Sequence, residues 1–320
     1  MLLKYKNYSK NYKKKGILIG ILVSFLSITH ADVVTSIRPL SFIAAAITDG
    51  VTDVQILIPN NVSPHDYSLK PSDLKKIKDA DLFIWVGSYM ETFLEKPLTQ
   101  LPTQKRITLI EVPAVKALLL KNRNDSLLIK NKISYYRHDD LNHNHHAYSK
   151  YNMHIWLSPD IARIAANIIH NQLLALYPNH KKQLDINLRN FVNELMKTDK
   201  NIAKILQSIG NKQYFVFHDA YIYFEKHYHL TSLGYFTINP IIHPGAKRLY
   251  QIKKILDQKK AVCIFFESQF RPGVIKNKNV QMGILDPLGS NIRLSKNSYL
   301  EFLTVLSNQF KSCLDKNRRN

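Results

Sequence analysis

The sequence is poor in glycine and lacks the motifs by which common enzymes are recognised. Ten glycines in 320 residues exclude a collagen-like or glycine-rich linker chain. No G-x-G-x-x-G, P-loop, G-x-S-x-G or H-E-x-x-H pattern occurs, so the usual nucleotide, hydrolase and zinc-protease signatures are missing. The composition, 45% hydrophobic and 22% charged, is instead typical of a globular protein with about two domains.

Acidic residues are also scarce: 45 Lys and Arg stand against 24 Asp and Glu, which gives a formal net charge of +21. Part of this charge belongs to the N-terminus, where six lysines between Lys4 and Lys15 precede the apolar run Gly16–Ile28. Small residues at Thr29 and Ala31 complete the pattern of a secretory signal peptide cleaved near Ala31. Thirteen apolar residues are too few to cross about 30 Å of hydrocarbon.

Export weakens the case for a nucleic-acid partner. Without the six lysines the formal charge falls from +21 to +15, and no zinc-finger spacing or other nucleic-acid module is present. No later stretch reaches 18 uninterrupted apolar residues, so we expect a soluble mature chain without a nucleic-acid partner.

The only two cysteines, Cys263 and Cys313, are interpreted in the light of export. Disulfides persist in oxidising compartments. A bridge between these residues would join the strand-like run Ala261–Phe266 to an amphipathic C-terminal helix. The alternative is two separate buried thiols.

Short apolar strands alternate with helical patterns, which predicts an α/β fold with mainly parallel sheets flanked by helices. Strands are expected at 33–36, 54–59, 81–87 and 106–112, then at 214–218, 232–238, 261–267 and 280–286, with Ser72 capping one of the helices. Hydrophobic spacing predicts helices at 159–176 and 179–209, the second long enough to join two lobes as a rigid strut. The predicted organisation is a signal peptide at 1–31, an N-terminal α/β lobe at 32–178, a linking helix at 179–209 and a C-terminal α/β lobe at 210–320.

Three histidines lie where loops meet strands or helices. His65 follows a strand, His154 precedes a helix and His218 ends a strand. Because ligands gather at the carboxyl ends of parallel strands, these three could form one metal site in a cleft between the lobes. Imidazole nitrogen suits zinc, copper, nickel or iron, and three histidines with one open position is a familiar zinc geometry. Taken alone, each histidine fits a structural role better than a ligand role, and only the three together indicate a metal site.

Carboxylates near these histidines are candidates for a fourth ligand. Asp286 ends a predicted strand, and Glu267, a weaker candidate, ends another. Each could instead cap a helix or hydrogen-bond a ligand. Asp66 and Asp219 directly follow a histidine, which favours supporting roles because adjacent side chains do not normally share one metal.

A polar stretch at 122–152 is expected to be an exposed loop. It contains His138, His143, His145 and His146 with Asp139 and Asp140. This composition favours either a weak auxiliary metal site or a solvated linker.

Several dispersed motifs carry a family resemblance. They are Ser36–Leu40, Ser63–Leu69, Ala80–Leu82 with Trp85–Gly87, Met153–Pro159, Phe215–Tyr221, Glu267–Pro272 and Leu285–Gly289. With these motifs in order from Val34 to the C-terminus, the sequence resembles the periplasmic zinc-binding proteins of bacterial zinc ABC importers, in the metal-binding cluster of solute-binding proteins.

The resemblance implies two α/β lobes joined by one long helix and a Zn²⁺ ligand held in the cleft by His65, His154 and His218. It implies a Cys263–Cys313 disulfide, a periplasmic monomer, and delivery of zinc to a membrane permease rather than catalysis. Manganese-binding relatives place a carboxylate where His218 stands, which favours zinc. In some relatives an acidic residue precedes the first histidine; here that residue is Pro64, which leaves water or Asp286 as the fourth ligand.

Two further classes remain as alternatives. A zinc hydrolase would need a general base beside the metal-bound water, and Asp286 or Glu267 could serve. A surface adhesin is suggested by some relatives, but no lipidated cysteine is present at the cleavage point.

Overall fold

The computed structural model describes residues 33–60, 62–123, 150–238, 240, 244–259, 261–267 and 280–315. The predicted signal peptide at 1–31 and the loop histidines His138, His143, His145 and His146 lie outside these residues. None of the described helices is long and apolar enough to cross a membrane.

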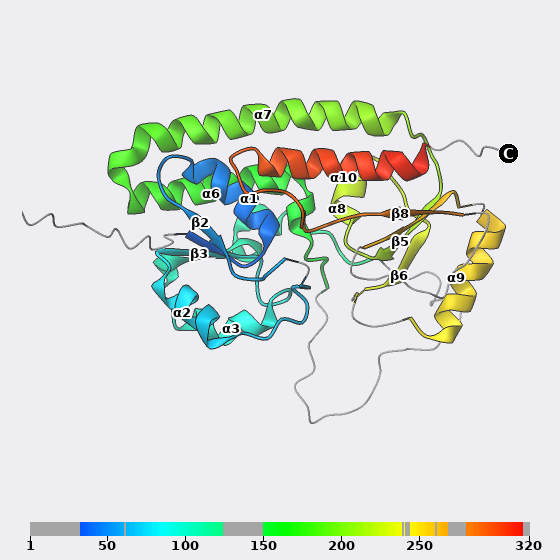
Figure 1. Cartoon of the computed structure of the whole chain (residues 1–320), viewed down its shortest axis with the longest axis horizontal. Coiled ribbons are helices and arrows are strands. Elements are labelled where there is room, and N and C mark those ends of the chain that lie inside the picture. Colours follow the sequence, from blue (N-terminus) through cyan, green and yellow to red (C-terminus); the bar gives the residue numbers. More distant parts are fainter. Residues whose placement is uncertain are drawn as a thin grey trace, which may run out of the picture. The chain divides into compact units, whose positions relative to one another are not determined.

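The described part of the chain forms two four-stranded sheets with helices around them (Figure 1). Every strand pair is parallel. The first sheet has the order β2-β1-β3-β4 and the second the order β6-β5-β7-β8, so both follow the same winding. The strands are β1 (Val33–Thr35), β2 (Val54–Ile56), β3 (Leu82–Trp85), β4 (Arg106–Thr108), β5 (Tyr214–His218), β6 (Gly234–Thr237), β7 (Cys263–Phe266) and β8 (Gln281–Ile284).

Nine α-helices are assigned in the described residues. They are α1 (Arg38–Thr48), α2 (Pro71–Asp79), α3 (Glu95–Thr99), α4 (Pro113–Lys116), α6 (Pro159–Leu176), α7 (Lys181–Gln207), α8 (Ile222–His227), α9 (Ala246–Lys259) and α10 (Ser298–Leu314). The fold class predicted from the sequence is confirmed, and the bounds of α6 agree with the prediction to the residue.

The central strands are buried along their whole length. All residues of β3, β5 and β7 are buried, as expected for parallel strands that are covered on both faces. The second sheet is rich in aromatic residues, and Phe215, Phe217, Phe236 and Phe266 form one cluster with α9. Each sheet thus has buried central strands, and the loops begin where these strands end.

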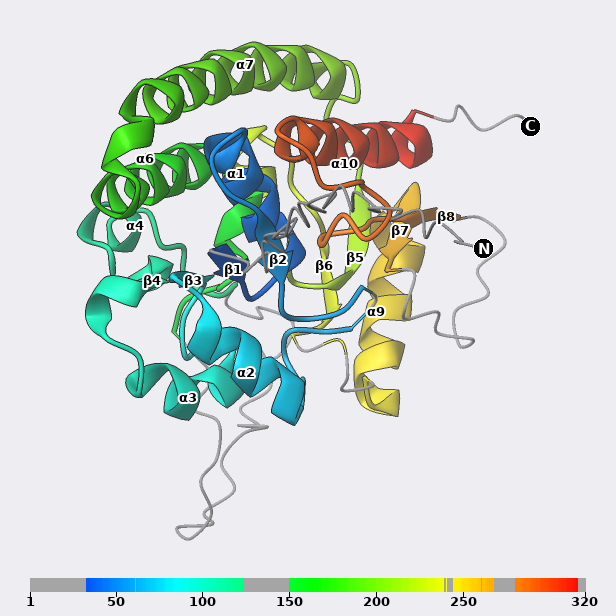
Figure 2. The same ribbon diagram turned by 60° about the vertical axis from the view of Figure 1, so that its left-hand side comes forward.

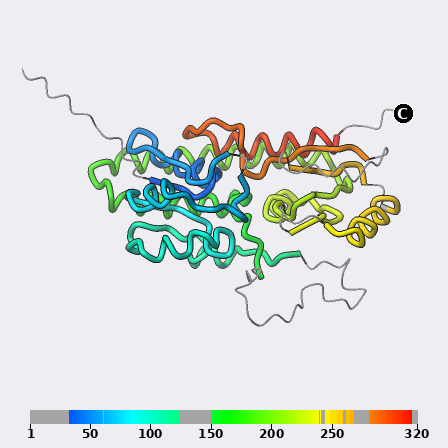
Figure 3. The backbone as a smooth tube through the Cα atoms, turned by 60° about the horizontal axis from the view of Figure 1, so that its bottom comes forward, coloured from blue at the N-terminus to red at the C-terminus, as the bar shows by residue number. Residues whose placement is uncertain are grey.

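The long helix α7 has 27 residues and so is about 40 Å long at 1.5 Å per residue. It lies above both sheets in the view of Figure 1, with α10 beside it, and the green and red traces lie together again in Figure 3. Helix α1 packs against α6, α7 and α10 (Figure 2). The last helix therefore contacts elements of both lobes.

The predicted disulfide between Cys263 and Cys313 is present, with a Cα–Cα distance of 6.0 Å. It joins the first residue of β7 to the end of α10. The disulfide therefore links helix α10 covalently to the second sheet.

Two local predictions are wrong. Helix α2 begins at Pro71 and its cap is Lys70 rather than Ser72, because proline favours the first helical position; the Lys70 amide donates to the Asp73 carboxylate at 2.9 Å. The polar stretch also does not stay exposed to its end, since Asn152 is only 3% exposed. That burial matters for the site described next.

Candidate metal centre

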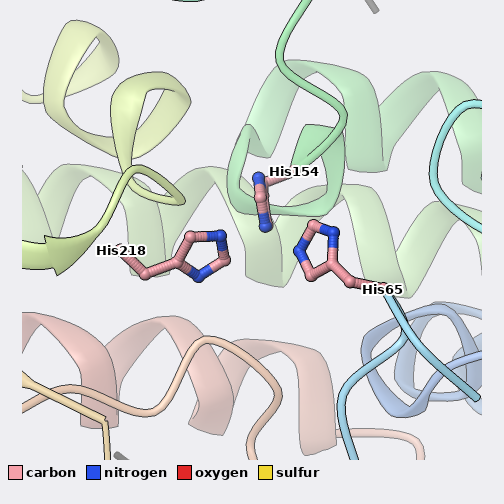
Figure 4. Close-up of side chains that lie close together, drawn as sticks. All are labelled: His65, His154 and His218. Carbon is pink, nitrogen blue, oxygen red and sulfur yellow. The ribbon is translucent and has the colours of Figure 1, made fainter. Parts of the chain in front are cut away.

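Three histidines from distant parts of the chain point toward one another (Figure 4). His65, His154 and His218 each offer a ligand nitrogen, and these nitrogens lie within 4.8 Å of one another. The ring centroids are 4.6 to 5.3 Å apart. No other group of three potential metal ligands occurs among the described residues.

His218 is held by the second sheet. It is the last residue of β5, and its Nδ1 lies 3.0 Å from the carboxylate of Glu267, the residue after the neighbouring strand β7. Because a carboxylate accepts hydrogen bonds, this contact places the imidazole proton on Nδ1. His218 Nε2 is buried and has no hydrogen-bond partner among the described residues.

His154 lies at the start of the short 3₁₀ helix Ile155–Leu157, which leads into α6. Its Nδ1 is 2.9 Å from Oδ1 of Asn152, and its backbone amide donates to the same oxygen at 3.0 Å. The Trp156 indole nitrogen donates to the Pro287 carbonyl at 2.7 Å. The histidine is therefore fixed both by its own segment and by a contact to the other lobe.

His65 lies on the loop between β2 and α2. Its backbone amide donates to the Ser63 hydroxyl at 3.2 Å. The side chain as a whole is half-buried, but Nε2 is buried and lacks a hydrogen-bond partner in the described residues. Among the three, this histidine has the least support from regular structure.

The environment keeps two of these imidazoles neutral. Burial, followed by repulsion from His218, lowers the pKa of His65 to about 3. Burial, followed by repulsion from His218 and His65, lowers the pKa of His154 well below its ordinary value. A neutral imidazole has a free lone pair, so the site favours a cation that imidazole nitrogen can bind.

The chemistry of this donor set matches zinc. Three histidine nitrogens and an open fourth position form a tetrahedral site of the kind found for Zn²⁺. Manganese and magnesium prefer carboxylate and other oxygen ligands, and no carboxylate belongs to the three-residue group.

The structure places the candidate carboxylates in supporting positions. Both oxygens of Asp286 accept backbone hydrogen bonds, from Leu288 at 3.0 Å and from Ser290 at 2.6 Å. Glu267 faces His218. Asp219 forms an ion pair with Arg123 at 3.0 Å, and Asp66 is exposed. None of the four joins the group of ligand atoms.

The turn that Asp286 caps explains two of the sequence motifs, Ser36–Leu40 and Leu285–Gly289. The Arg38 guanidinium donates to the carbonyls of Gly289, at 3.1 Å, and of Ile292. Gly289 has a φ of +63°, and a Cβ there would lie 2.7 Å from the Phe42 ring. The motif around Arg38 thus fastens helix α1 to the turn that Asp286 caps.

Asn152 was not singled out from the sequence. Its side chain contacts His154 and donates from Nδ2 to the Asp219 carbonyl at 2.6 Å. The one available signal is its place two residues before His154, and that spacing does not reveal the contact with Asp219, 67 residues away.

Two α/β lobes with a histidine cluster between them define a metal-binding protein of the two-lobed, solute-binding class. The model of the family "Zinc-uptake complex component A periplasmic" (ZnuA) matches residues 33–313. The chain therefore belongs to this family.

Individual members of the family are similar to this chain over nearly its whole length. The high-affinity zinc uptake system protein ZnuA of Yersinia pestis is 51% identical over 301 residues, covering 92% of this chain and 94% of the relative. That of Haemophilus ducreyi is 43% identical, covering 94% and 99%. Among solved structures, the periplasmic zinc-binding protein TroA of Treponema pallidum has a TM-score of 0.68 at 18% identity, covering 88% of this chain and 98% of that one. At this identity the likeness concerns the fold.

Proposed function

We propose that this protein captures Zn²⁺ between its two lobes and delivers it to the membrane permease of a zinc ABC importer. The observation that carries the proposal is the meeting of three imidazoles, two of them with pKa values lowered by burial. Membership of the zinc-uptake family supports zinc as the cargo. The relatives from Yersinia pestis and Haemophilus ducreyi are themselves zinc uptake proteins.

The proposed ligands are His65, His154 and His218, with water in the fourth position. Asp286 is the less suitable fourth ligand because both of its oxygens already accept backbone hydrogen bonds. Moving this carboxylate to the metal would leave the Leu288 and Ser290 amides without their acceptor. The histidines His138, His143, His145 and His146 would at most add a weak auxiliary site.

Binding without catalysis is the favoured activity. A hydrolase needs a general base aimed at the metal-bound water. Of the two candidates, Asp286 caps a turn. Glu267 lies 3.0 Å from His218 Nδ1, which is not the proposed metal-binding nitrogen, and 3.4 Å from the Tyr221 hydroxyl. Both carboxylates are thus engaged in holding the structure around the site.

The proposed setting is the periplasm, reached through a signal peptide cleaved near Ala31. The Cys263–Cys313 disulfide is compatible with this oxidising compartment. We expect a monomer, organised as the lobes 32–178 and 210–320 with the linking helix at 179–209.

The test is a calorimetric titration of the purified mature protein with zinc, followed by competition with manganese. Zinc should bind with one ion per chain and should not be displaced by equimolar manganese. His218→Ala should weaken binding by at least about 100-fold, more than the loss of a supporting residue, whereas His145→Ala should change it less than twofold. Preference for manganese, or the reverse order of the two variants, would refute the proposal.

A further inference from the structure

Asn152 occupies an unusual place between the two lobes. It follows the isolated bridge between Lys121 and Tyr151, and its own backbone amide donates to Leu120 at 2.8 Å. Its carbonyl accepts from the Tyr223 hydroxyl of α8 at 2.8 Å. The residue is 3% exposed, so its side-chain amide must find partners inside the protein.

Two backbone groups determine how this amide is oriented. The His154 N–H can only donate, and it points at one end of the amide, which must therefore be the oxygen. The Asp219 carbonyl can only accept, and it lies 2.6 Å from the other end, which must be the nitrogen. The orientation is thus imposed by chemistry and does not depend on how nitrogen and oxygen are assigned.

This orientation determines the tautomer of His154. Its Nδ1 lies 2.9 Å from the Asn152 oxygen, which can only accept, so the ring proton must be on Nδ1. In a neutral imidazole Nε2 is then the atom with the free lone pair. Glu267 acts in the same way on His218 within the second lobe, whereas Asn152 contacts His154 in its own lobe and Asp219 in the other.

We propose that Asn152 is a positioning residue that selects the metal-binding nitrogen of His154 and sets the distance between His154 and His218. One end of the amide holds the His154 ring, and the other holds the residue next to His218. The two rings are 4.6 Å apart. This inference rests on the proposed zinc-binding function, since the two rings then share one ion.

A matched control is available in helix α7. Asn187 is also a buried asparagine, and its Nδ2 donates to the carbonyls of Ile47 and Asp49 at 2.8 Å each. Asn187→Ala removes the same amide and a similar number of hydrogen bonds but touches no histidine of the cluster. A general loss of stability should therefore appear in both variants, and a change at the metal site only at Asn152.

The experiment combines ¹⁵N NMR of the metal-free protein, labelled at histidine, with zinc titration. In the wild-type protein and in Asn187→Ala, His154 should show the Nδ1–H tautomer. In Asn152→Ala it should show a mixture of tautomers, and zinc affinity should fall about 10- to 100-fold, the usual effect of losing a partner of a metal-binding histidine. An unchanged tautomer, or zinc affinity within twofold of wild type, would overturn the inference.

Asn152→Asp keeps the test decisive if the alanine variant does not fold. The carboxylate still accepts from the His154 Nδ1–H but cannot donate to the Asp219 carbonyl. The tautomer should be retained while zinc affinity falls at least tenfold; wild-type affinity would contradict the spacing role. If the wild-type protein itself fails to bind zinc, the proposed function fails, and the tautomer of the metal-free protein still tests what Asn152 does.

Discussion

The two lobes share one sheet topology but stabilise their buried groups in different ways. In the second lobe His218 ends a strand, Glu267 follows the adjacent strand, and a disulfide ties β7 to α10. In the first lobe His65 and His154 lie outside the strands, and the backbone amide of each donates to the side chain two residues earlier. Equal strand order therefore does not imply equal support for the metal site.

Buried acids reveal the same contrast. In the second lobe Asp219 and Glu225 are buried beside the Arg123 guanidinium, which forms ion pairs with both. In the first lobe Glu91 is fully buried, and its hydrogen-bond donors among the described residues are neutral, among them the Ser36 hydroxyl and the Gly87 amide at 2.9 Å. One lobe neutralises its acids by pairing, whereas the other relies on protonation and hydrogen bonds.

The strongest way to test this contrast is to remove the cation. Arg123→Met removes the cation that pairs with the buried Asp219 and Glu225, although the Tyr214 hydroxyl still donates to Glu225 at 2.8 Å. The free energy of unfolding should fall by up to about 5 kcal/mol. Arg189→Met, on the exposed face of α7, is the control and should change it by less than about 0.5 kcal/mol. Equal effects in urea denaturation would show that the pairing does not stabilise the lobe.

Removing the disulfide tests the covalent support of the second lobe. The bridge spans 50 residues, and the chain-entropy account gives such a loop a stabilisation of roughly 4 kcal/mol. The double variant Cys263→Ala with Cys313→Ala should lose about this much in urea denaturation. Zinc affinity should stay within about twofold of wild type, because His218 is positioned by β5 and Glu267. A large loss of affinity would mean that the bridge also positions the ligand.

The pH dependence of the unfolding free energy tests how the first lobe stabilises the buried Glu91. Burial raises its pKa to about 7, and hydrogen bonds from Ser36, Gly87 and Val86 partly oppose this. The folded protein then holds a proton that the unfolded chain releases from about pH 4.5 upward. Its contribution to stability therefore falls as pH rises from about 4.5 to 7 and is constant above that range.

The expected size of this effect is on the order of 3 kcal/mol between pH 4.5 and pH 7. Glu91→Gln should remove it, so the difference in unfolding free energy between wild type and variant should change with pH by about this amount. Glu301→Gln, at an exposed position on α10, should keep the wild-type profile. Parallel pH profiles for wild type and Glu91→Gln would contradict the protonated state of the buried carboxyl.

The sequence was sufficient for the elements and for the histidines, because both leave local patterns. Hydrophobic spacing placed α6 at Pro159–Leu176, and positions at strand ends or before a helix indicated His65, His154 and His218. The supporting contacts were not predictable in the same way. Asn152 meets Asp219 across 67 residues, and His218 meets Glu267 across 49, and these distances in sequence carry no periodic signal.

The capping of α2 shows a more local reason for failure. Serine is a favoured cap, but Pro71 takes the first helical position and moves the cap to Lys70. The sequence likewise does not distinguish water from Asp286 as the fourth ligand, because only the folded turn shows that both carboxylate oxygens accept backbone hydrogen bonds, from Leu288 and Ser290.

The central claim is that both lobes bind one zinc ion through three imidazoles. X-ray absorption at the zinc edge of the loaded protein tests it directly. We expect three histidine nitrogens at about 2.0–2.1 Å from the zinc and one further oxygen from water, with no sulfur ligand. His154→Ala should reduce the imidazole signal to two. A spectrum with fewer than three imidazoles in the wild-type protein, or one that the loss of His154 leaves unchanged, would contradict the account.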